Sequence, residues 1–418
     1  VYTLSLAELF CYFERNSLEI SIIDASPEVL VIETEGQLDA LKIQRELGGT
    51  VKILRVVDIV KKRELDSINF ALQNYFKPSK IKTDFLKNAK GKIQFGVSVY
   101  LLDGSLRPFG EPKRLGMYIK RAMQDSGASI RLVLPEFNGL ALASVVVTKN
   151  LLIEKGAEIC AIASTTKVYV AKTLVVQDFE DYGRRDYQRP IRDDKQGMIP
   201  PKVAQMMLNF VNAKVNETIL DPMCGIGTIV QEGVLLNYRV LGSDINPAAI
   251  AGSEKNLEWF RNRYKIAKGK YHVEVADTQQ VSLLVANLAQ IGAFQKIMGI
   301  VTEGYLGPMY GHFPKPQEIE ANFQELTTLY KNAFQDFLKF LPKGGRVVLC
   351  LPAYKNRNEY VMFPNLDEIT NIGYNLVDLI PPALAASMPF LKLTERGTAI
   401  YDRKDQVVAR EILIFERN

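Results

Sequence analysis

Cysteine and histidine are scarce in this chain of 418 residues. The four cysteines form no CxxC pair, which argues against a zinc site and against a disulfide framework. They are Cys11, Cys160, Cys224 and Cys350. His272 and His312 are too few and too far apart in the sequence to suggest a histidine-based metal site or catalytic triad. We therefore expect no metal, and a reducing cytoplasm is the simplest location for the protein.

Long apolar runs are also missing. No stretch of about eighteen apolar residues occurs, so we expect no membrane-spanning helix. With 47% hydrophobic and 24% charged residues, the composition is that of an ordinary soluble globular protein. The net charge of +5 permits a nucleic-acid partner without demonstrating one. The length predicts two or three domains, and we expect a monomer. Because Val1 is not methionine and a helical pattern starts at once, we expect a trimmed N-terminus.

Short helices and strands alternate in the first 176 residues, which is typical of α+β layers. In the first stretch we expect helices over 5–13 and 38–47 and strands over 18–24, 29–35 and 49–57. In the second stretch we expect a helix over 114–126 and strands over 92–101, 129–135, 141–149, 156–164 and 167–176.

Residues 177–197 are charged, rich in turn formers and without an apolar period, which predicts a linker. Tyrosines are interleaved with arginines that could clamp phosphates or contact RNA. These arginines are Arg184, Arg185, Arg189 and Arg192. The segment carries nearly as many acidic residues, so a solvated or domain-pairing linker is the alternative to direct RNA contact.

After residue 200 strands alternate with helices, which predicts a mostly parallel sheet with right-handed crossovers. The expected strands are 217–221, 239–244, 272–277, 296–303 and 346–351. Apolar residues at spacings of three and four predict an amphipathic helix over 323–341. Residues 410–415 predict one more strand, part of an antiparallel edge pair.

The segment LDPMCGIGTIV, residues 220–230, has the pattern of a strand, a glycine turn and a helix start. The strand ends at Asp221, the chain turns through Gly225 and Gly227, and Thr228 opens a helix. Glycines at such a turn let the backbone approach a ligand, and the helix start offers unpaired N–H groups.

Further acidic residues stand at the ends of the next three strands: Asp244, Asp277 and Glu303. In an open α/β sheet these ends face the crevice where ligands bind. Asp244 could bind both ribose hydroxyls of a nucleotide, and Asp277 with Thr278 could accept from an adenine amino group. The alternative for each acid is a helix N-cap.

A G-x-G-x-x-G triplet is absent, since the turn reads G-I-G-T. This difference favours S-adenosylmethionine over NAD as the cofactor, and without a GK[ST] sequence P-loop chemistry is not expected. Upstream, Pro200 and Pro201 suit a helix start. Lys202 in the first turn is poorly placed for the helix dipole, so it could instead meet a carboxylate such as that of the cofactor's methionine.

Taken together, these motifs resemble the Rossmann-like S-adenosylmethionine-dependent methyltransferases that act on exocyclic amines. More closely, residues 197–210 running into 220–228 resemble the THUMP-containing tRNA guanine-N2 methyltransferases. Residues 47–53 are similar to the ferredoxin-like domain of that family, and residues 116–159 to its THUMP domain. The resemblance implies domains over 1–75 (ferredoxin-like), 76–176 (THUMP), 177–197 (linker) and 198–418 (methyltransferase).

The same resemblance implies roles for particular residues. The methionine end of the cofactor is expected to contact Asp221, Gly225 and Gly227. Its ribose is expected to contact Asp244, and its adenine Asp277 and Thr278. Cofactor contacts are also expected for Met198, Lys202, Cys224, Thr228 and Ile245. The family's Asp-Pro-Pro-Tyr catalytic loop is replaced by Glu303, Gly304 and Tyr305. Glu303 can accept hydrogens of the target amine and Tyr305 can stack on the base, while Gly304 lacks the stiffness of proline.

The implied function is methyl transfer to the N2 amine of a guanosine in tRNA, commonly at position 10, with the first two domains gripping the acceptor end. The alternatives are methylation of an amine in DNA or another RNA, and a tRNA-binding protein that keeps the fold without turnover. No DNA-reading helix pair or zinc module stands in the first 176 residues.

Overall fold

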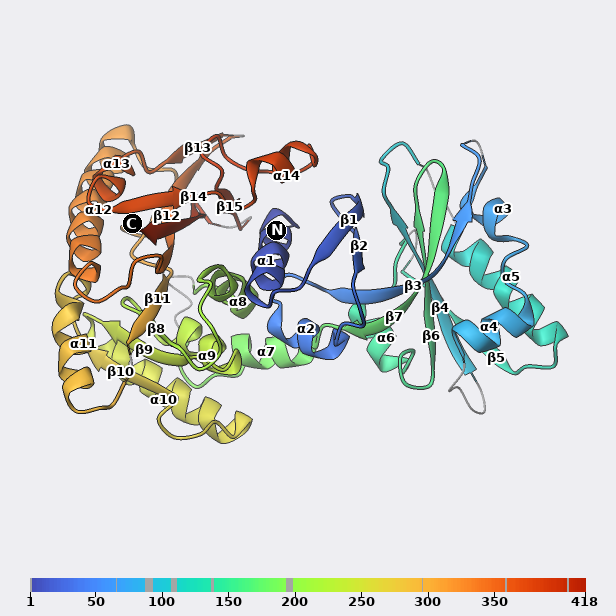
Figure 1. Cartoon of the computed structure of the whole chain (residues 1–418), viewed down its shortest axis with the longest axis horizontal. Coiled ribbons are helices and arrows are strands. Elements are labelled where there is room, and N and C mark those ends of the chain that lie inside the picture. Colours follow the sequence, from blue (N-terminus) through green and yellow to red (C-terminus); the bar gives the residue numbers. More distant parts are fainter. Residues whose placement is uncertain are drawn as a thin grey trace. The chain divides into compact units, whose positions relative to one another are not determined.

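The computed structural model describes residues 2–64, 66–86, 93–106, 111–136, 139–192, 198–294, 296–357, 359–403 and 406–418. The chain divides into two compact units (Figure 1). Unit 1 comprises Val1–Leu18, Glu46–Gly49 and Glu180–Asn418, and unit 2 comprises Glu19–Arg45 and Thr50–Phe179.

A sheet with the strand order β10-β9-β8-β11-β12-β16-β14 forms the centre of unit 1. Its strands are β8 (Thr218–Asp221), β9 (Arg239–Asp244), β10 (Tyr271–Val275), β11 (Ile297–Thr302), β12 (Arg346–Asn356), β13 (Glu359–Met362), β14 (Tyr374–Val377), β15 (Ala399–Tyr401) and β16 (Val408–Arg417). The strands from β10 to β12 in this order are parallel, and β16 is antiparallel to both β12 and β14. The predicted sheet is confirmed, and β16 with β14 forms the expected antiparallel pair at its edge.

Helices and single turns connect these strands. They are α8 (Pro201–Phe210), α9 (Thr228–Leu235), α10 (Pro247–Tyr264), η1 (Thr278–Gln280), α11 (Val281–Gln290), α12 (Pro316–Phe337), α13 (Asp367–Thr370) and α14 (Pro382–Ala386). The amphipathic pattern of α12 is confirmed, because Phe323, Leu326, Tyr330, Phe334 and Phe337 are all buried in the core that this helix forms with the sheet.

Unit 2 has a five-stranded sheet of order β3-β7-β6-β4-β5, in which β4 is parallel to β5 and β6 and the other pairs are antiparallel. The strands are β3 (Lys52–Lys61), β4 (Ile93–Leu101), β5 (Ile130–Val133), β6 (Gly156–Ala163) and β7 (Lys167–Val176). Figure 1 shows α3 (Ile68–Leu72), α4 (Pro78–Asp84) and α5 (Glu111–Asp125) along one face of the sheet, where they share its core. A separate hairpin of β1 (Ile20–Ala25) and β2 (Leu30–Thr34) and the helix α2 (Ala40–Glu46) precede this sheet.

The expected strand over 141–149 is wrong, since Ser144–Lys149 form the helix α6. The run of valines there favours a strand by local propensity. Tertiary contacts decide otherwise: the Leu142 N–H donates to the Ser98 hydroxyl at 2.9 Å, and Val147 is buried against Leu142 and Leu152. These contacts hold the segment as a helix packed through Val147.

The expected boundary between domains 1–75 and 76–176 is not where the chain divides. β3 from the first stretch pairs along its whole length with β7 from the second, so the two stretches share one sheet. The first helix, α1 (Tyr2–Arg15), belongs instead to unit 1, where it packs on α8. Arg15 of α1 donates to the Asn209 side chain at 2.8 Å and to the Tyr238 hydroxyl at 2.7 Å.

A buried carboxylate holds α1 in place. The oxygens of Glu8 accept from the N–H groups of Gly48 and Gly49, each at 2.8 Å, and from the amide of Asn209 at 2.7 Å. Burial raises the pKa of Glu8 to about 7, against these hydrogen bonds, which lower it. The short segment Glu46–Gly49 belongs to unit 1 because of these contacts.

Residues 177–197 do not form a solvated linker throughout. Phe179–Tyr187 form the helix α7, and Arg185 is buried with its Nε 2.7 Å from a carboxylate oxygen of Glu232 on α9. The opposite end of the expected linker, residues 193–197, lies outside the described residues. Composition alone suggested solvent exposure because the acids and bases of this segment nearly cancel, whereas in the structure several of them pair within unit 1.

Candidate active site

The glycine turn after β8 brings its backbone close to α10. Gly225 and Gly227 have φ values of +51° and +88°, in the left-handed region that favours glycine. A Cβ on Gly227 would lie 2.5 Å from the hydroxyl oxygen of Ser253 on α10, so space as well as backbone angle requires glycine here. α9 begins at Thr228 without a side-chain cap, so its first N–H groups are available to a ligand.

Cys224 supports this turn from within. Its N–H donates to the Ser243 carbonyl at 2.8 Å, and its own carbonyl accepts from the Gly227 N–H at 2.9 Å. The thiol is buried, and burial raises its pKa well above the ordinary value. Cys224 is therefore a packing residue that shapes the turn by its backbone.

Asp221, the last residue of β8, is buried almost completely. Burial raises the pKa of its carboxyl group to about 8, and the negative charges of Asp244 and Glu303 add to this effect. Hydrogen bonds from the Thr302 hydroxyl and the Met223 N–H oppose it. A cationic ligand group beside Asp221 would stabilise the ionised carboxylate, as expected for the ammonium of a bound methionine.

Asp244, at the end of β9, holds the glycine turn. One carboxylate oxygen accepts from the Gly225 N–H and the other from the Asn246 N–H, each at 2.9 Å. The adjacent Ile245 is 68% exposed, an unusual place for a large apolar side chain. A carboxylate followed by an exposed aliphatic side chain fits a ribose and the face of an attached base.

Asp277 follows β10 and caps η1, because it accepts from the Gln279 N–H at 2.9 Å. The cap interpretation thus holds for Asp277, and one carboxylate oxygen is still available to a ligand. Thr278 is buried, and in the described part of the chain its hydroxyl has no hydrogen-bond partner. A buried hydroxyl without a partner is costly and fits a site that a ligand completes.

Glu303, at the end of β11, has a partner that sequence reasoning missed. Arg410 on β16 is buried, and its Nε lies 2.5 Å from Oε1 of Glu303. The Ile199 N–H donates to Oε2 of Glu303 at 3.3 Å. A lone arginine within the apolar run VVAREILIF was the available signal, since a charge inside a buried strand requires a partner.

The loop after Glu303 is tied to α12. Gly304 has a φ of +73°, and a Cβ there would lie 2.5 Å from the Tyr330 hydroxyl. Proline, with φ near −65°, is excluded from this position. The Tyr330 hydroxyl donates to the Tyr305 carbonyl at 2.6 Å, and the Asn322 amide donates to the Leu306 carbonyl at 3.2 Å. Hydrogen bonds from α12 thus replace the stiffness of proline.

Tyr305 itself presents its ring to solvent and is 40% exposed. Farther along the loop, Gly307 has a φ of +97°, and a Cβ there would overlap the side chain of Asn322. The loop is therefore fixed at Gly304 and Gly307 while its aromatic ring remains accessible.

The upstream residues Met198 and Lys202 have contacts with other parts of the protein. Met198 offers its carbonyl to Arg403 at 3.4 Å, next to Ile199, which contacts Glu303. Lys202 is half-buried, with Nζ 5.2 Å from the centre of the Tyr182 ring. Burial lowers the pKa of Lys202. This cation–π contact gives Lys202 a structural role, and the carboxylate partner expected from its position stays a prediction.

Two of the four arginines proposed for RNA lie inside unit 1, which corrects that expectation for them. Arg185 pairs with Glu232 and Asp181, and Arg189 is buried with Nη1 2.6 Å from the Thr228 hydroxyl at the start of α9. Arg184 is partly exposed and pairs with Glu180, whereas Arg192 is exposed over the Tyr187 ring. Arg189 is thus a neighbour of the glycine turn, and only Arg184 and Arg192 keep accessible surface.

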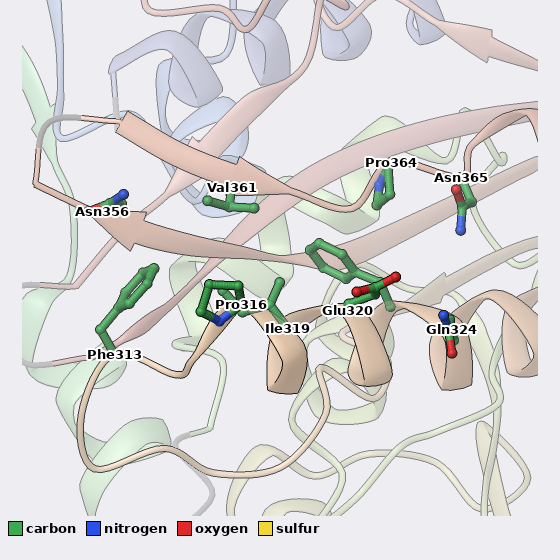
Figure 2. Close-up of a pocket in the computed structure, with 10 residues that line it drawn as sticks. Phe313, Pro316, Ile319, Glu320, Gln324, Asn356, Val361, Pro364 and Asn365 are labelled. Carbon is green, nitrogen blue, oxygen red and sulfur yellow. The ribbon is translucent and has the colours of Figure 1, made fainter.

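A surface pocket of about 470 Å³ opens beside the continuation of the loop (Figure 2). Phe313, Pro316, Ile319 and Phe323 supply apolar surface, and Figure 2 shows Glu320 and Gln324 on α12 facing Val361 and Asn365. The pocket joins the end of the loop to the hairpin of β12 and β13.

Strand order, glycine turn and acids at the strand ends together define a Rossmann-like methyltransferase fold. TrmN from Thermus thermophilus superposes with a TM-score of 0.55 at 12% identity, covering 99% of this chain and 97% of that one. A possible methylase from Clostridium difficile 630 gives a TM-score of 0.50 at 12% identity, covering 100% and 96%. The fold predicted from the sequence is confirmed.

One family model matches a segment that includes the start of the methyltransferase sheet. Residues 189–289 match the family model described as RMKL-like, methyltransferase domain. The tRNA (guanine(10)-N2)-dimethyltransferase of Methanothermobacter thermautotrophicus is 27% identical over 160 residues, which are 38% of this chain and 40% of that protein. The protein of the same name from Methanocaldococcus jannaschii is 28% identical over 182 residues, 39% of this chain and 50% of that protein.

This chain thus spans half or less of the length of these two relatives. The resemblance is confirmed for the methyltransferase region, whereas a THUMP domain and a ferredoxin-like domain in the earlier residues stay predictions. Among the described residues, no helix is long and apolar enough to cross a membrane, and no group of three metal-binding side chains occurs.

Proposed function

We propose that this protein is an S-adenosylmethionine-dependent methyltransferase that acts on the N2 amine of a guanosine in tRNA. The observation that carries the proposal is the fixed loop with Glu303 and Tyr305 at the end of β11, beside β8 and its glycine turn. Both relatives are named for the same reaction, which supports the choice of acceptor.

The residues at the strand ends fit the cofactor. Asp221 would accept the ammonium of its methionine, and the N–H groups at the start of α9 would face its carboxylate. Asp244 would bind the ribose hydroxyls, Ile245 would cover the adenine, and Asp277 with Thr278 would meet the adenine amine. Bound there, S-adenosylmethionine supplies a methyl group on a positively charged sulfur.

The protein's own contribution is to hold the target amine. The lone pair of a guanine N2 is delocalised into the ring, so it must be aimed at the methyl carbon by acceptors for its hydrogens. Glu303 supplies one acceptor, and the loop backbone at Gly304 supplies a second. Tyr305 stacks on the base. With the cofactor bound, N2 would form a bond to its methyl carbon, the electrons of the broken carbon–sulfur bond would stay on sulfur, and N2 would then lose a proton to solvent.

Positioning accounts for most of the rate in such a transfer, because little base catalysis is needed. The contacts of Tyr330 and Asn322 with the loop therefore favour turnover over a protein that only binds tRNA.

Unit 2 supplies a surface suited to RNA. Unit 2 (residues 19–45 and 50–179) contains 23 Lys and Arg against 17 Asp and Glu, whereas unit 1 contains 29 against 30. Lysine and arginine that neutralise phosphates give most of the non-specific affinity for nucleic acid. We assign tRNA binding chiefly to unit 2, in line with the THUMP resemblance, and cytoplasmic action as a monomer completes the proposal.

The test is a nucleoside analysis. The full chain is incubated with unmodified tRNA transcripts and methyl-labelled cofactor, and the tRNA is then digested. We expect label in N2-methylguanosine. Label in adenosine or in a ribose would contradict the acceptor, and tight cofactor binding without transfer to any RNA would favour the protein without turnover. Competition between tRNA and duplex DNA for binding at one salt concentration distinguishes a tRNA methyltransferase from a DNA methyltransferase.

A further inference from the structure

Arg410 is a buried charge that contacts Glu303 of the proposed catalytic loop, and it comes from a distant part of the sequence. It is 3% exposed on β16, the last strand. Its Nε lies 2.5 Å from Oε1 of Glu303, and its Nη1 donates to the side-chain oxygen of Gln406 at 2.7 Å. A guanidinium in this environment has a fixed direction, because two of its nitrogens are held by neighbouring acceptors.

Glu303 is held from two sides as a result. Arg410 contacts Oε1, and the Ile199 N–H donates to Oε2 at 3.3 Å. The preceding residue, Met198, is itself contacted by Arg403 through its carbonyl. A carboxylate has about four lone-pair positions, so these two contacts leave acceptor capacity for an amine hydrogen. Two fixed contacts also leave the carboxylate only one orientation in which to offer that capacity.

We propose that Arg410 is the positioning residue for Glu303, which it holds oriented toward the target amine. The inference rests on the proposed function and adds a component to it. It also explains why glutamate replaces aspartate in this loop: the side chain must reach from the end of β11 to an arginine on β16. Glu303 and Arg410 then form one functional pair, supplied by separate strands.

A double-mutant cycle on the full chain tests this pair. Arg410→Gln and Glu303→Gln are each expected to lower kcat by about 10²-fold or more, with cofactor affinity and the KM for tRNA within about threefold of the wild type. The double variant should be no slower than Glu303→Gln alone, because Arg410 acts only through Glu303. Additive losses in kcat would overturn the proposal.

Conservative variants separate positioning from folding. Arg410→Lys keeps the charge but not the fork of donors, so we expect partial activity. In Glu303→Asp the side chain is too short to reach Arg410, so we expect a loss of activity comparable to that of Arg410→Lys. In Arg410→Ala, guanidinium ion at concentrations too low to unfold the protein should restore part of kcat, and it should have no effect on Glu303→Ala. If Arg410→Lys has no activity and guanidinium ion does not restore kcat in Arg410→Ala, a positioning role for Arg410 is contradicted.

A matched control lies on the same strand. Glu411, the neighbour of Arg410, is buried and pairs with Arg396, away from the loop. Arg396→Gln should lower the thermal stability while leaving kcat per folded molecule unchanged. An equal loss of kcat in Arg396→Gln would show that any buried charge on β16 matters and would refute the specific role of Arg410. If the wild-type protein yields no methylated nucleoside, the proposed function fails. If it does and Arg410 variants keep full kcat, only this inference fails.

Discussion

Units 1 and 2 use their charges differently. In unit 1, Arg410 points toward Glu303 and Arg185 toward Glu232, and each is buried beside that carboxylate. Unit 2 also buries one ion pair, Lys52 with Glu158, but most of its basic surplus is spread over its surface. On α5 the residues Lys113, Arg114 and Arg121 are all exposed.

The difference indicates a division of work. A charge held inside the fold has one geometry and can orient a reacting group. A charge on the surface attracts a polyanion at long range and is screened by salt. We therefore expect changes in unit 1 to alter kcat or cofactor affinity, and changes in unit 2 to alter tRNA affinity.

Glu303→Ala is expected to have the largest effect on the reaction. Removing the carboxylate takes away an acceptor for the amine hydrogen, and we expect kcat to fall by about 10²- to 10³-fold, similar to the loss of one fixed hydrogen-bond group in other active sites. Cofactor affinity, measured by calorimetry, should stay nearly intact. A parallel loss of cofactor and tRNA binding would mean that Glu303 supports the fold more than the chemistry.

Reversing the charge of Lys113, Arg114 and Arg121 to glutamate should weaken tRNA binding by about 10²-fold near 0.1 M salt. The slope of log Kd against log salt should also become shallower, by about 0.7 to 0.9 for each lost phosphate contact. At saturating tRNA, kcat should be unchanged.

The matched control reverses three exposed basic residues of unit 1: Arg263, Lys265 and Lys268, at and just after the end of α10. Equal weakening by both sets would show that net charge alone governs binding and would break the proposed division between the units.

Asp244→Ala should weaken cofactor binding more than it lowers kcat. It removes acceptors for the ribose and the contact with the Gly225 N–H that holds the glycine turn, so we expect about 10- to 50-fold lower cofactor affinity, on the order of 1.4 to 2.3 kcal/mol. Calorimetry checks the affinity, and assays at saturating cofactor should recover most of kcat. An unrecovered kcat would assign Asp244 to the reacting geometry.

Asp221 should make cofactor binding depend on pH. Its pKa of about 8 in the free protein means that the carboxyl group is protonated at neutral pH, and a bound ammonium requires it ionised. Affinity should therefore rise with pH up to about 8, by at most about tenfold per pH unit, with release of a proton. Calorimetry in buffers of different ionisation enthalpy measures that release, and Asp221→Asn should abolish the dependence.

The same pKa has a consequence for stability. Because the folded-state pKa of Asp221 is raised above its ordinary value, the stability that the protonated group contributes is full at low pH and is lost as pH rises toward about 8. Asp221→Asn should therefore flatten the unfolding free energy of the free protein over this range. A steeper decline in the variant would contradict the assignment.

Phe313→Ala should have the smallest effect, a rise of about threefold in the KM for tRNA. The ring contributes apolar surface to the pocket beside the loop, where a nucleotide next to the target base could lie (Figure 2). Steady-state assays at several tRNA concentrations measure the change. A change in cofactor affinity would instead place the pocket within the cofactor site.

Most strands and the ligand-facing strand ends could be predicted from the sequence. β7 and β9 have the predicted bounds, because their apolar runs stop at residues that cannot continue a buried strand. Asp221, Asp244 and Glu303 fall at strand ends for the same reason. The pattern of apolar residues therefore predicts that these acids lie at strand ends, without any knowledge of tertiary contacts.

Other parts depend on contacts between residues distant in the sequence. The valine run of α6 has the propensity of a strand, and α7 has the composition of a linker. Arg410 stands 107 positions from Glu303, and no local pattern joins them. For Gly304, the sequence showed a lost proline but not the Tyr330 and Asn322 contacts that compensate for it.

The membership of α1 in unit 1 bears on the order of events during synthesis. α1 is synthesised before α8, on which it packs and which begins only at Pro201. At about 5 to 20 residues per second, the ribosome needs on the order of 10 to 40 s to make the intervening chain, during which the apolar face of α1 lacks its native cover. Unit 2 is complete by Phe179. Unit 2 can therefore fold on the ribosome before α1 packs against α8 in unit 1.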